Sequence, residues 1–402
     1  AINHFKDKEI SKSISAIKDL ADPMIDDKTH LDGVVVPLLL AWSYVLDQEY
    51  QEAFKVIDNI TTSYMLSIFA YNRALINDIA NGKEVSVTDL PADAPTFEKA
   101  KRSIAEVFHE IGKYSMQQGN LEETIIYIRL ARFINPEVHK YRDLLASAFE
   151  SQGKSEKVIE VYGEVEKTSE YYNEAQYNIA ISYHKLGDLE KAKEILNKLA
   201  QNEKFAYKSY FALGTIKMAN DKYEEAVKYF GKAIDEIEQE QKNHWNVYFN
   251  LAVSQDRLNR WEEAEKNLKK AIEIFPSNPE TLNYLAYSWL IKNKNVKQAR
   301  SMLEAAVIKS GGAPHILDSY GWALYKMGLY KEALPFLEQA AISIPYNPVI
   351  NNHLGDVYWA LGRKLEAKYQ WQKALDNYND EISSEISLED LKMKSSEGMD
   401  LE

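Results

Sequence analysis

Eight histidines are the side chains best suited to bind a metal or to transfer protons near neutral pH, and they are scattered along the chain. No two of them have a metal-binding spacing such as His-Glu-x-x-His. His353 and Asp356 share one face of an expected helix, which is more typical of a hydrogen-bonded pair than of a catalytic site. We therefore predict no catalytic residue and no metal ligand in this chain.

Other catalytic signatures are also missing. The sequence has no cysteine, which excludes disulfides, thiolate nucleophiles and cysteine-ligated zinc. It has no Gly-x-Ser-x-Gly and no Gly-x-Gly-x-x-Gly segment. Gly311 and Gly312 follow Lys309, but without the spacing of a phosphate-binding loop, so we interpret them as a connection between helices. The sequence thus predicts a protein that is not an enzyme and binds no cofactor.

The charge and the apolar segments of the sequence limit the classes of binding partner. The formal net charge of −13 argues against nucleic acid, because phosphate recognition begins with clustered Lys and Arg. The longest apolar run, 34–42, contains Pro37 and is far shorter than the roughly 20 residues of a membrane-spanning helix. We predict no nucleic acid partner and no direct membrane insertion. A protein or peptide partner remains.

A repeat of 34 residues organises most of the chain. The segment 314–347 defines a frame that continues in both directions, with four extra residues at 241–244 and one extra residue within 279–313. Chains of 402 residues rarely fold around one core, so a stacked repeat is a natural solution. The frame predicts an array over 97–381 with eight repeats: 105–138, 139–172, 173–206, 207–240, 245–278, 279–313, 314–347 and 348–381.

Four columns of this frame have a mechanical meaning. Small residues at columns 8, 20 and 27 allow two helices to pack closely. Column 15 holds only residues that accept the left-handed backbone conformation at the end of a helix. Its members are Gly119, Gly153, Gly187, Asp221, Asn259, Asn293, Gly328 and Gly362. The pattern therefore predicts two helices and a tight turn in each repeat.

The segment from Tyr320 to Ala333, with Pro345 after it, resembles the tetratricopeptide repeat (TPR) consensus, and the resemblance extends over 105–381. It implies an all-α fold: a right-handed superhelix, or α-solenoid, of antiparallel helix pairs. It also implies a protein–protein interaction scaffold or adaptor. In this family the first helix of each repeat lines a concave groove through columns 2, 5, 6, 9, 12 and 13.

Aromatic and amide side chains fill these columns in the last four repeats. Aromatic rings give large contact areas at low entropic cost, and amides can pair with a peptide backbone in both directions. An alternative is that the rings pack between repeats or against the C-terminal helix. The predicted peptide-binding residues are Phe249, Asn250, Asn283, Tyr284, Tyr287, Trp322, Tyr325, Asn352, Asp356 and Trp359.

The two ends depart from the regular array. Residues 1–82 form a degenerate TPR-like helical region with one recognisable repeat at 34–61, and 83–96 is expected to be a linker. A helix expected over 8–20 has no upstream partner for its apolar face, so we expect the region to be truncated at its N-terminus. Residues 382–402 are acidic and have few apolar anchors, which predicts a C-terminal tail or a frayed helix.

The closing segment, from Asp318 to Trp371, is similar to a group of bacterial TPR adaptors and lipoproteins of the cell envelope. This looser resemblance implies a periplasmic or envelope-associated location rather than a cytoplasmic one. Two alternatives stay open. The chain could be the TPR fragment of a larger enzyme or sensor, or it could be a scaffold that self-associates into a homo-oligomer.

Overall fold

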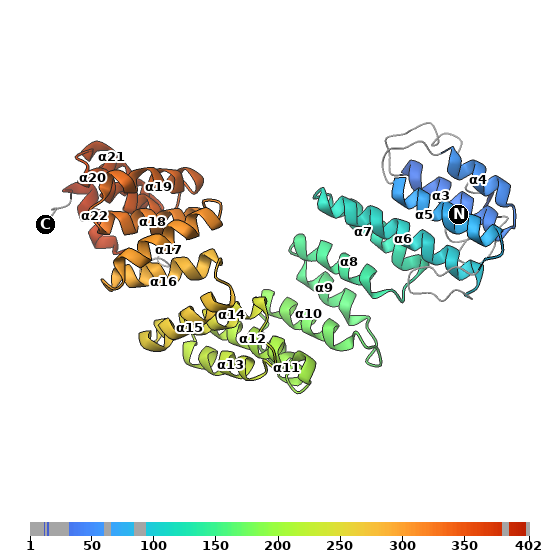
Figure 1. Cartoon of the computed structure of the whole chain (residues 1–402), viewed down its shortest axis with the longest axis horizontal. Helices are drawn as coiled ribbons and strands as arrows, with labels where there is room; N and C mark the ends of the chain where they lie inside the picture. Colours follow the sequence, from blue (N-terminus) through green and yellow to red (C-terminus); the bar gives the residue numbers. More distant parts are fainter. Residues whose placement is uncertain are drawn as a thin grey trace. The chain divides into compact units, whose positions relative to one another are not determined.

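The computed structural model describes residues 12, 14, 15, 32–59, 66–83, 94–379 and 386–398. These residues are helical or connect helices, and no strand occurs among them. Figure 1 shows the helices lying in antiparallel pairs that follow one another along the chain. The expected all-α fold class is confirmed. The chain forms two compact units, 1–199 and 200–402.

The first unit contains a hydrophobic core that extends from Ile14 to Ile179. Its helices are α3 (Asp32–Leu46), α4 (Tyr50–Asp58), α5 (Leu66–Ala80), α6 (Thr96–Gln117), α7 (Leu121–Ile134), α8 (His139–Ser151), α9 (Ser155–Gly163), α10 (Tyr172–Lys185) and α11 (Leu189–Leu199). α3 and α4 occupy the degenerate repeat expected at 34–61. α6 begins at Thr96, well before the first full repeat of the frame. The helix expected over 8–20 lies almost entirely outside the described residues.

The second unit continues the pairing. Its helices are α12 (Glu203–Ala219), α13 (Tyr223–Asp235), the 3₁₀ helix η1 (Lys242–His244), α14 (Trp245–Arg257), α15 (Trp261–Ile274), α16 (Pro279–Ile291), α17 (Val296–Lys309), α18 (Pro314–Lys326), α19 (Tyr330–Ser343), α20 (Pro348–Ala360), α21 (Lys364–Asp376) and α22 (Leu388–Ser396). The four extra residues at 241–244 include η1. The single extra residue of 279–313 lies in the turn between α16 and α17.

The small residues of column 8 set the distance between the two helices of a pair. A Cβ atom added to Gly355 would lie 2.4 Å from the indole nitrogen of Trp371, and one added to Gly321 would lie 2.6 Å from Leu337. The partners are the large residues of column 24 on the second helix. Trp371 and Leu337 are fully buried. Glycine is thus needed where a large ring or branched side chain crosses the first helix.

The turns follow from column 15. All eight of its members adopt a positive φ, from 54° at Asn293 to 79° at Gly187 and Gly362. The N-terminal ends of α16 and α20, the first helices of two repeats, are likewise determined by neighbouring residues. Asn278 and Asn347 accept hydrogen bonds from the backbone N–H groups of Thr281 and Ile350, at 2.9 and 3.0 Å, and a proline occupies the first turn.

The C-terminal region differs from the expected tail. Residues 388–396 form α22, which packs against α21. Ile386 and Leu391 supply the apolar anchors, and Ser387 caps the helix by accepting a hydrogen bond from the N–H of Asp390. Within the described part of the chain, no helix combines the length and apolar character that crossing a membrane requires.

Candidate protein-interaction site

The predicted binding residues all lie on the first helices of the last four repeats. α14 carries Phe249 and Asn250; α16 carries Asn283, Tyr284 and Tyr287; α18 carries Trp322 and Tyr325; α20 carries Asn352, Asp356 and Trp359. α16 contacts α18, and α18 contacts α20. We call the surface that these four helices form the first-helix face. The face has three parts, on α14 with α16, on α18 and on α20, and different side chains cover the predicted residues in each.

On α14 and α16 the aromatic rings pack between repeats. The ring of Phe249 meets that of Tyr284 edge-on at 5.7 Å and that of Trp245 at the same distance. The Tyr284 hydroxyl donates a hydrogen bond of 3.0 Å to Asp256, and burial beside this carboxylate raises the pKa of Tyr284. Phe249 and Tyr284 are half-buried, so each has both a packing role and a surface that a partner could contact.

Asn283 on α16 carries one of the buried polar atoms that have no hydrogen-bond partner among the described residues. Its side-chain oxygen is buried, yet no described residue donates a hydrogen bond to it. A buried acceptor without a donor destabilises a fold by about 1–3 kcal/mol, and such groups are rare in native proteins. Asn250 and Tyr287, also half-buried, lie on the same face of the repeat array. Asn283 is therefore a polar group that the fold itself leaves unsatisfied.

On α18, Trp322 packs against its neighbours, and the ammonium group of Lys326 lies 4.7 Å from the centre of its ring. Its ring stacks on Tyr325 at 4.8 Å and on His353 at 4.0 Å, with interplanar angles of 12° and 15°. His353 forms a hydrogen bond of 2.9 Å with Asp318 on α18, and both side chains are buried. Trp322 is half-buried, and these stacked side chains reduce the surface that a partner could contact. The sequence suggested a hydrogen bond between His353 and Asp356, but His353 instead forms this contact with Asp318 in the preceding repeat.

On α20, the predicted residues face the chain's own α22. The ammonium group of Lys394 lies 3.0 Å from Asp356 and 3.4 Å from the side-chain oxygen of Asn352. Asn352, Asp356 and Trp359 are all buried. Burial raises the pKa of Asp356, against the opposing effect of Lys394. While α22 is in place, these three residues are not open to another molecule.

Sequence reasoning missed Lys394 because it lies beyond the last repeat, in a segment that looks polar and acidic. A signal was nevertheless present. Leu391 and Lys394 are spaced three apart, as are residues on one face of a helix, and Ser387 is a typical capping residue before them. The contact of His353 with Asp318 joins adjacent repeats, so neither residue's own helix could indicate it.

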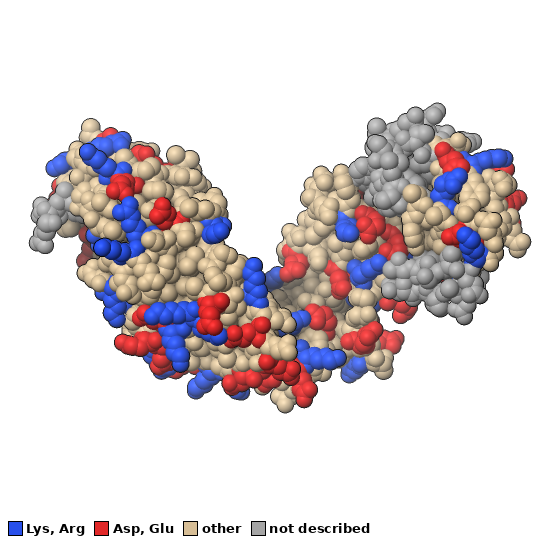
Figure 2. Space-filling model, viewed as in Figure 1, with Lys and Arg blue, Asp and Glu red and all other residues tan. Residues whose placement is uncertain are grey.

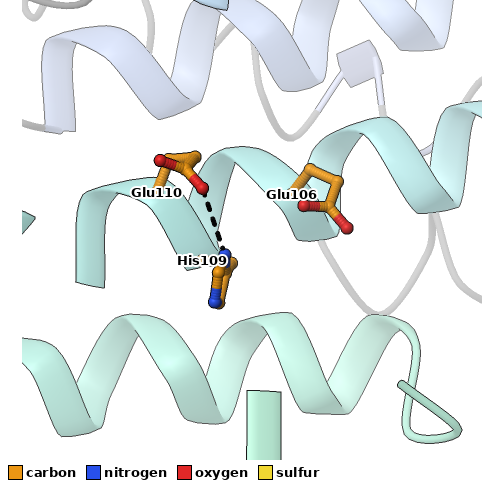
Figure 3. Close-up of side chains that lie close together, drawn as sticks. All are labelled: Glu106, His109 and Glu110. Atoms are coloured by element: carbon orange, nitrogen blue, oxygen red, sulfur yellow. Dashed lines mark ion pairs between the residues drawn. The ribbon is translucent and has the colours of Figure 1, made fainter. Parts of the chain in front are cut away.

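One cluster in the first unit resembles a metal site. Glu106, His109 and Glu110 lie on α6 with potential ligand atoms within 4.8 Å of one another, as Figure 3 shows. However, Glu106 already accepts hydrogen bonds from Lys140 at 2.8 Å and Tyr141 at 2.7 Å. A divalent cation at Glu106 would be repelled by Lys140 and by Arg102, whose Nε is 3.4 Å from the same carboxylate. The cluster is better explained as the ionic contact between α6 and α8.

Charged side chains are mixed on the surface. On the face of the molecule in Figure 2, Lys and Arg lie among Asp and Glu without forming one continuous basic area over the described residues. Many of them belong to ion pairs between exposed side chains, such as Arg300 with Glu332 at 2.7 Å and Lys270 with Glu240 at 3.0 Å. Such pairs stabilise a fold by less than about 1 kcal/mol each. The absence of a nucleic acid partner stays a prediction.

Comparison with known proteins agrees with the repeat architecture. Models of the tetratricopeptide repeat family match residues 174–203, 205–277 and 249–314. The chain therefore contains tetratricopeptide repeats, and such repeats imply the function of a protein-interaction scaffold. The family is generally non-catalytic. No curated protein matches the chain in sequence.

Comparison with solved structures finds several similar chains. The APC/C hetero-tetramer Cut9–Hcn1 is similar with a TM-score of 0.52 at 13% identity, covering 90% of this chain and 76% of that chain. A tetratricopeptide repeat protein from Parabacteroides merdae has a TM-score of 0.40 at 17% identity, covering 72% and 98%. YrrB, a TPR protein with an unusual peptide-binding site, has a TM-score of 0.35 at 19% identity, covering 48% and 92%.

Proposed function

We propose that this protein is a non-enzymatic scaffold that binds a peptide segment of a partner protein on the first-helix face. The part of the face on α14 and α16 is the contact region. Phe249, Tyr284 and Tyr287 supply half-buried aromatic surface, and Asn250 and Asn283 supply amide groups. This contact region excludes Trp322, whose ring is stacked on neighbouring side chains. It also excludes the three residues of α20 that α22 covers.

The observation that carries this proposal is the unsatisfied oxygen of Asn283. Because this oxygen is shielded from solvent, binding requires the Asn283 side chain to turn outward, and a backbone N–H of an extended peptide is then a donor of the kind that this acceptor lacks. The neighbouring aromatic residues would then bury the peptide's apolar side chains, as aromatic residues do at the centres of interfaces. A bacterial envelope complex as the setting stays a prediction of the looser sequence resemblance.

A test compares binding of the full chain to a library of random peptides before and after change of this region. We expect the double variant Asn283→Leu with Tyr287→Ala to lose at least ten-fold in affinity for the peptides that the unmodified chain selects. Tyr369→Ala is the matched control, because this ring is 66% exposed and lies on the second helix α21. Equal binding by the double variant, or equal loss in the control, would contradict the proposal.

Two other functions remain open from the sequence. Self-association would make the sedimentation of the full chain depend on concentration, whereas a monomeric scaffold would sediment alike at all concentrations. Membership of a larger enzyme or sensor would be decided by the coding sequence on either side of this chain. Neither alternative has a described side-chain arrangement of its own to favour it over peptide binding.

A further inference from the structure

α22 is held against the last repeat by one narrow side. Leu391 is completely buried, Lys394 is 7% exposed, and Ile386 just before the helix is 4% exposed. Lys392 and Met393 between them point outward. The contact surface of α22 is thus an apolar residue followed three positions later by a cation, one helical turn along the same side.

The receiving surface is formed by α21, against which α22 packs, and by first-helix positions of α20. Asp356 accepts a hydrogen bond from Lys394 through one carboxylate oxygen and from the indole of Trp371, at 2.9 Å, through the other. Beyond the helix, the backbone at Gly398 lies against Trp359, since an added Cβ would be 2.1 Å from that ring. The surface therefore has a buried anion for the cation and a flat ring for the chain that follows it.

The contact between α22 and the last repeat discriminates between partners more than it stabilises the docked helix. A helix of nine residues is not stable by itself in water, so α22 exists as a helix only while docked. A buried ion pair adds little net stability, because both charges lose their hydration, but it selects its partner strongly. Because α22 covers Asp356, departure of α22 exposes this carboxylate to water and to any other cation that can take the place of Lys394.

From these contacts we infer that the α20–α21 surface is a docking site for a short amphipathic helix that presents one buried cation, and that α22 occupies this site exchangeably. A partner helix with a leucine-sized residue and a Lys or Arg three positions later would occupy the same place when α22 leaves. The inference names a partner chemistry for one end of the first-helix face. This site lies outside the α14–α16 contact region, so the inference goes beyond the proposed function, and α22 itself provides a test that needs no external partner.

The test uses the full chain and a fluorescent peptide with the sequence of residues 386–398. In the unmodified chain the tethered α22 competes at an effective concentration of about millimolar, so we expect no binding of micromolar peptide. In the Leu391→Asp chain α22 cannot dock, and we expect the peptide to bind, as measured by fluorescence anisotropy. The peptide with Lys394→Glu should bind at least ten-fold more weakly, whereas the Lys392→Glu peptide should bind like the original.

Hydrogen exchange in the unmodified chain gives a second measurement. We expect the amides of α22 to exchange faster than those of α20 and α21, because α22 leaves its site without unfolding them. Equal protection of the three helices would overturn the inference, as would failure of the Leu391→Asp chain to fold. Peptide binding that ignores the Lys394→Glu change would overturn it too. Loss of random-peptide binding in the Asn283→Leu chain tests the proposed function separately.

Discussion

The ammonium group of Lys394 and the carboxylate of Asp356 lie 3.0 Å apart, with side chains only 9% and 3% exposed. Lys394 also lies 3.1 Å from Asp390, one turn earlier on its own helix, but that carboxylate is 42% exposed. The buried partner and the exposed partner therefore differ in how strongly they hold α22. A charge pair shielded from water is weakened little by salt, whereas an exposed pair is screened.

Asp356→Asn is expected to release α22. Removing one member of a buried ion pair costs about 3–5 kcal/mol when the other must stay buried. Here Lys394 can reach water if α22 undocks, so the loss is limited to the free energy of docking. We expect the amides of α22 to exchange at least ten-fold faster, while those of α16 and α18 are unchanged. The control is Asp390→Asn, and an equal effect of both variants would contradict the role of burial.

Gly355→Ala is expected to destabilise the second unit. The new Cβ would lie 2.4 Å from the indole nitrogen of Trp371, which is fully buried and cannot move aside. Overpacking of this kind costs about 1–3 kcal/mol. Gly231→Ala is the matched control, because nothing lies within 4 Å of its added Cβ and α13 should gain about 0.5–1 kcal/mol. Urea unfolding measures both, and equal effects would count against close packing at column 8.

The repeat fold could be predicted from the sequence because its determinants are local. Gly355 and Trp371 are 16 positions apart, and the residues of column 15 fix each turn by their own backbone preference. A 34-residue period makes these local signals recur, so a single register accounts for most of the chain. The same register also placed the candidate binding residues correctly on the first helices of the last four repeats.

The accessibility of the candidate site could not be predicted in the same way. Whether the faces of Trp322 are open depends on His353 in the next repeat, and His353 is held by Asp318 in the preceding one. Whether Asp356 is open depends on Lys394, which lies outside the period. These contacts join residues 31 to 38 positions apart, and one sequence carries no direct record of such pairs.

The stability of the first unit should depend on the protonation of His109. Burial lowers the pKa of His109 below its ordinary value of 6.5, and this effect outweighs the opposing charge of Glu106. The folded chain therefore keeps the imidazole neutral, whereas the unfolded chain takes up a proton near the ordinary value. Stability is present above that value and is lost as the pH falls through the folded pKa.

His109→Phe should remove this part of the pH dependence while keeping a ring against Tyr141, whose ring centre is 5.2 Å from that of His109. Thermal unfolding at several pH values between about 7.5 and 5 compares the variant with the unmodified chain. We expect the midpoint of the variant to fall less on acidification. His315→Phe is the control, because His315 is half-exposed beside Glu280. Identical pH profiles for the unmodified chain and His109→Phe would refute the prediction.

Asn283→Leu should make the protein more stable and less able to bind. Leucine has nearly the shape of asparagine but no oxygen, so the buried acceptor that lacks a donor disappears. We expect a gain on the order of 1 kcal/mol in the free energy of unfolding, measured in urea. Peptide affinity should fall at the same time, since binding residues are often retained at a cost in stability. A variant that is both less stable and unchanged in peptide binding would mean that Asn283 serves the fold and not a partner.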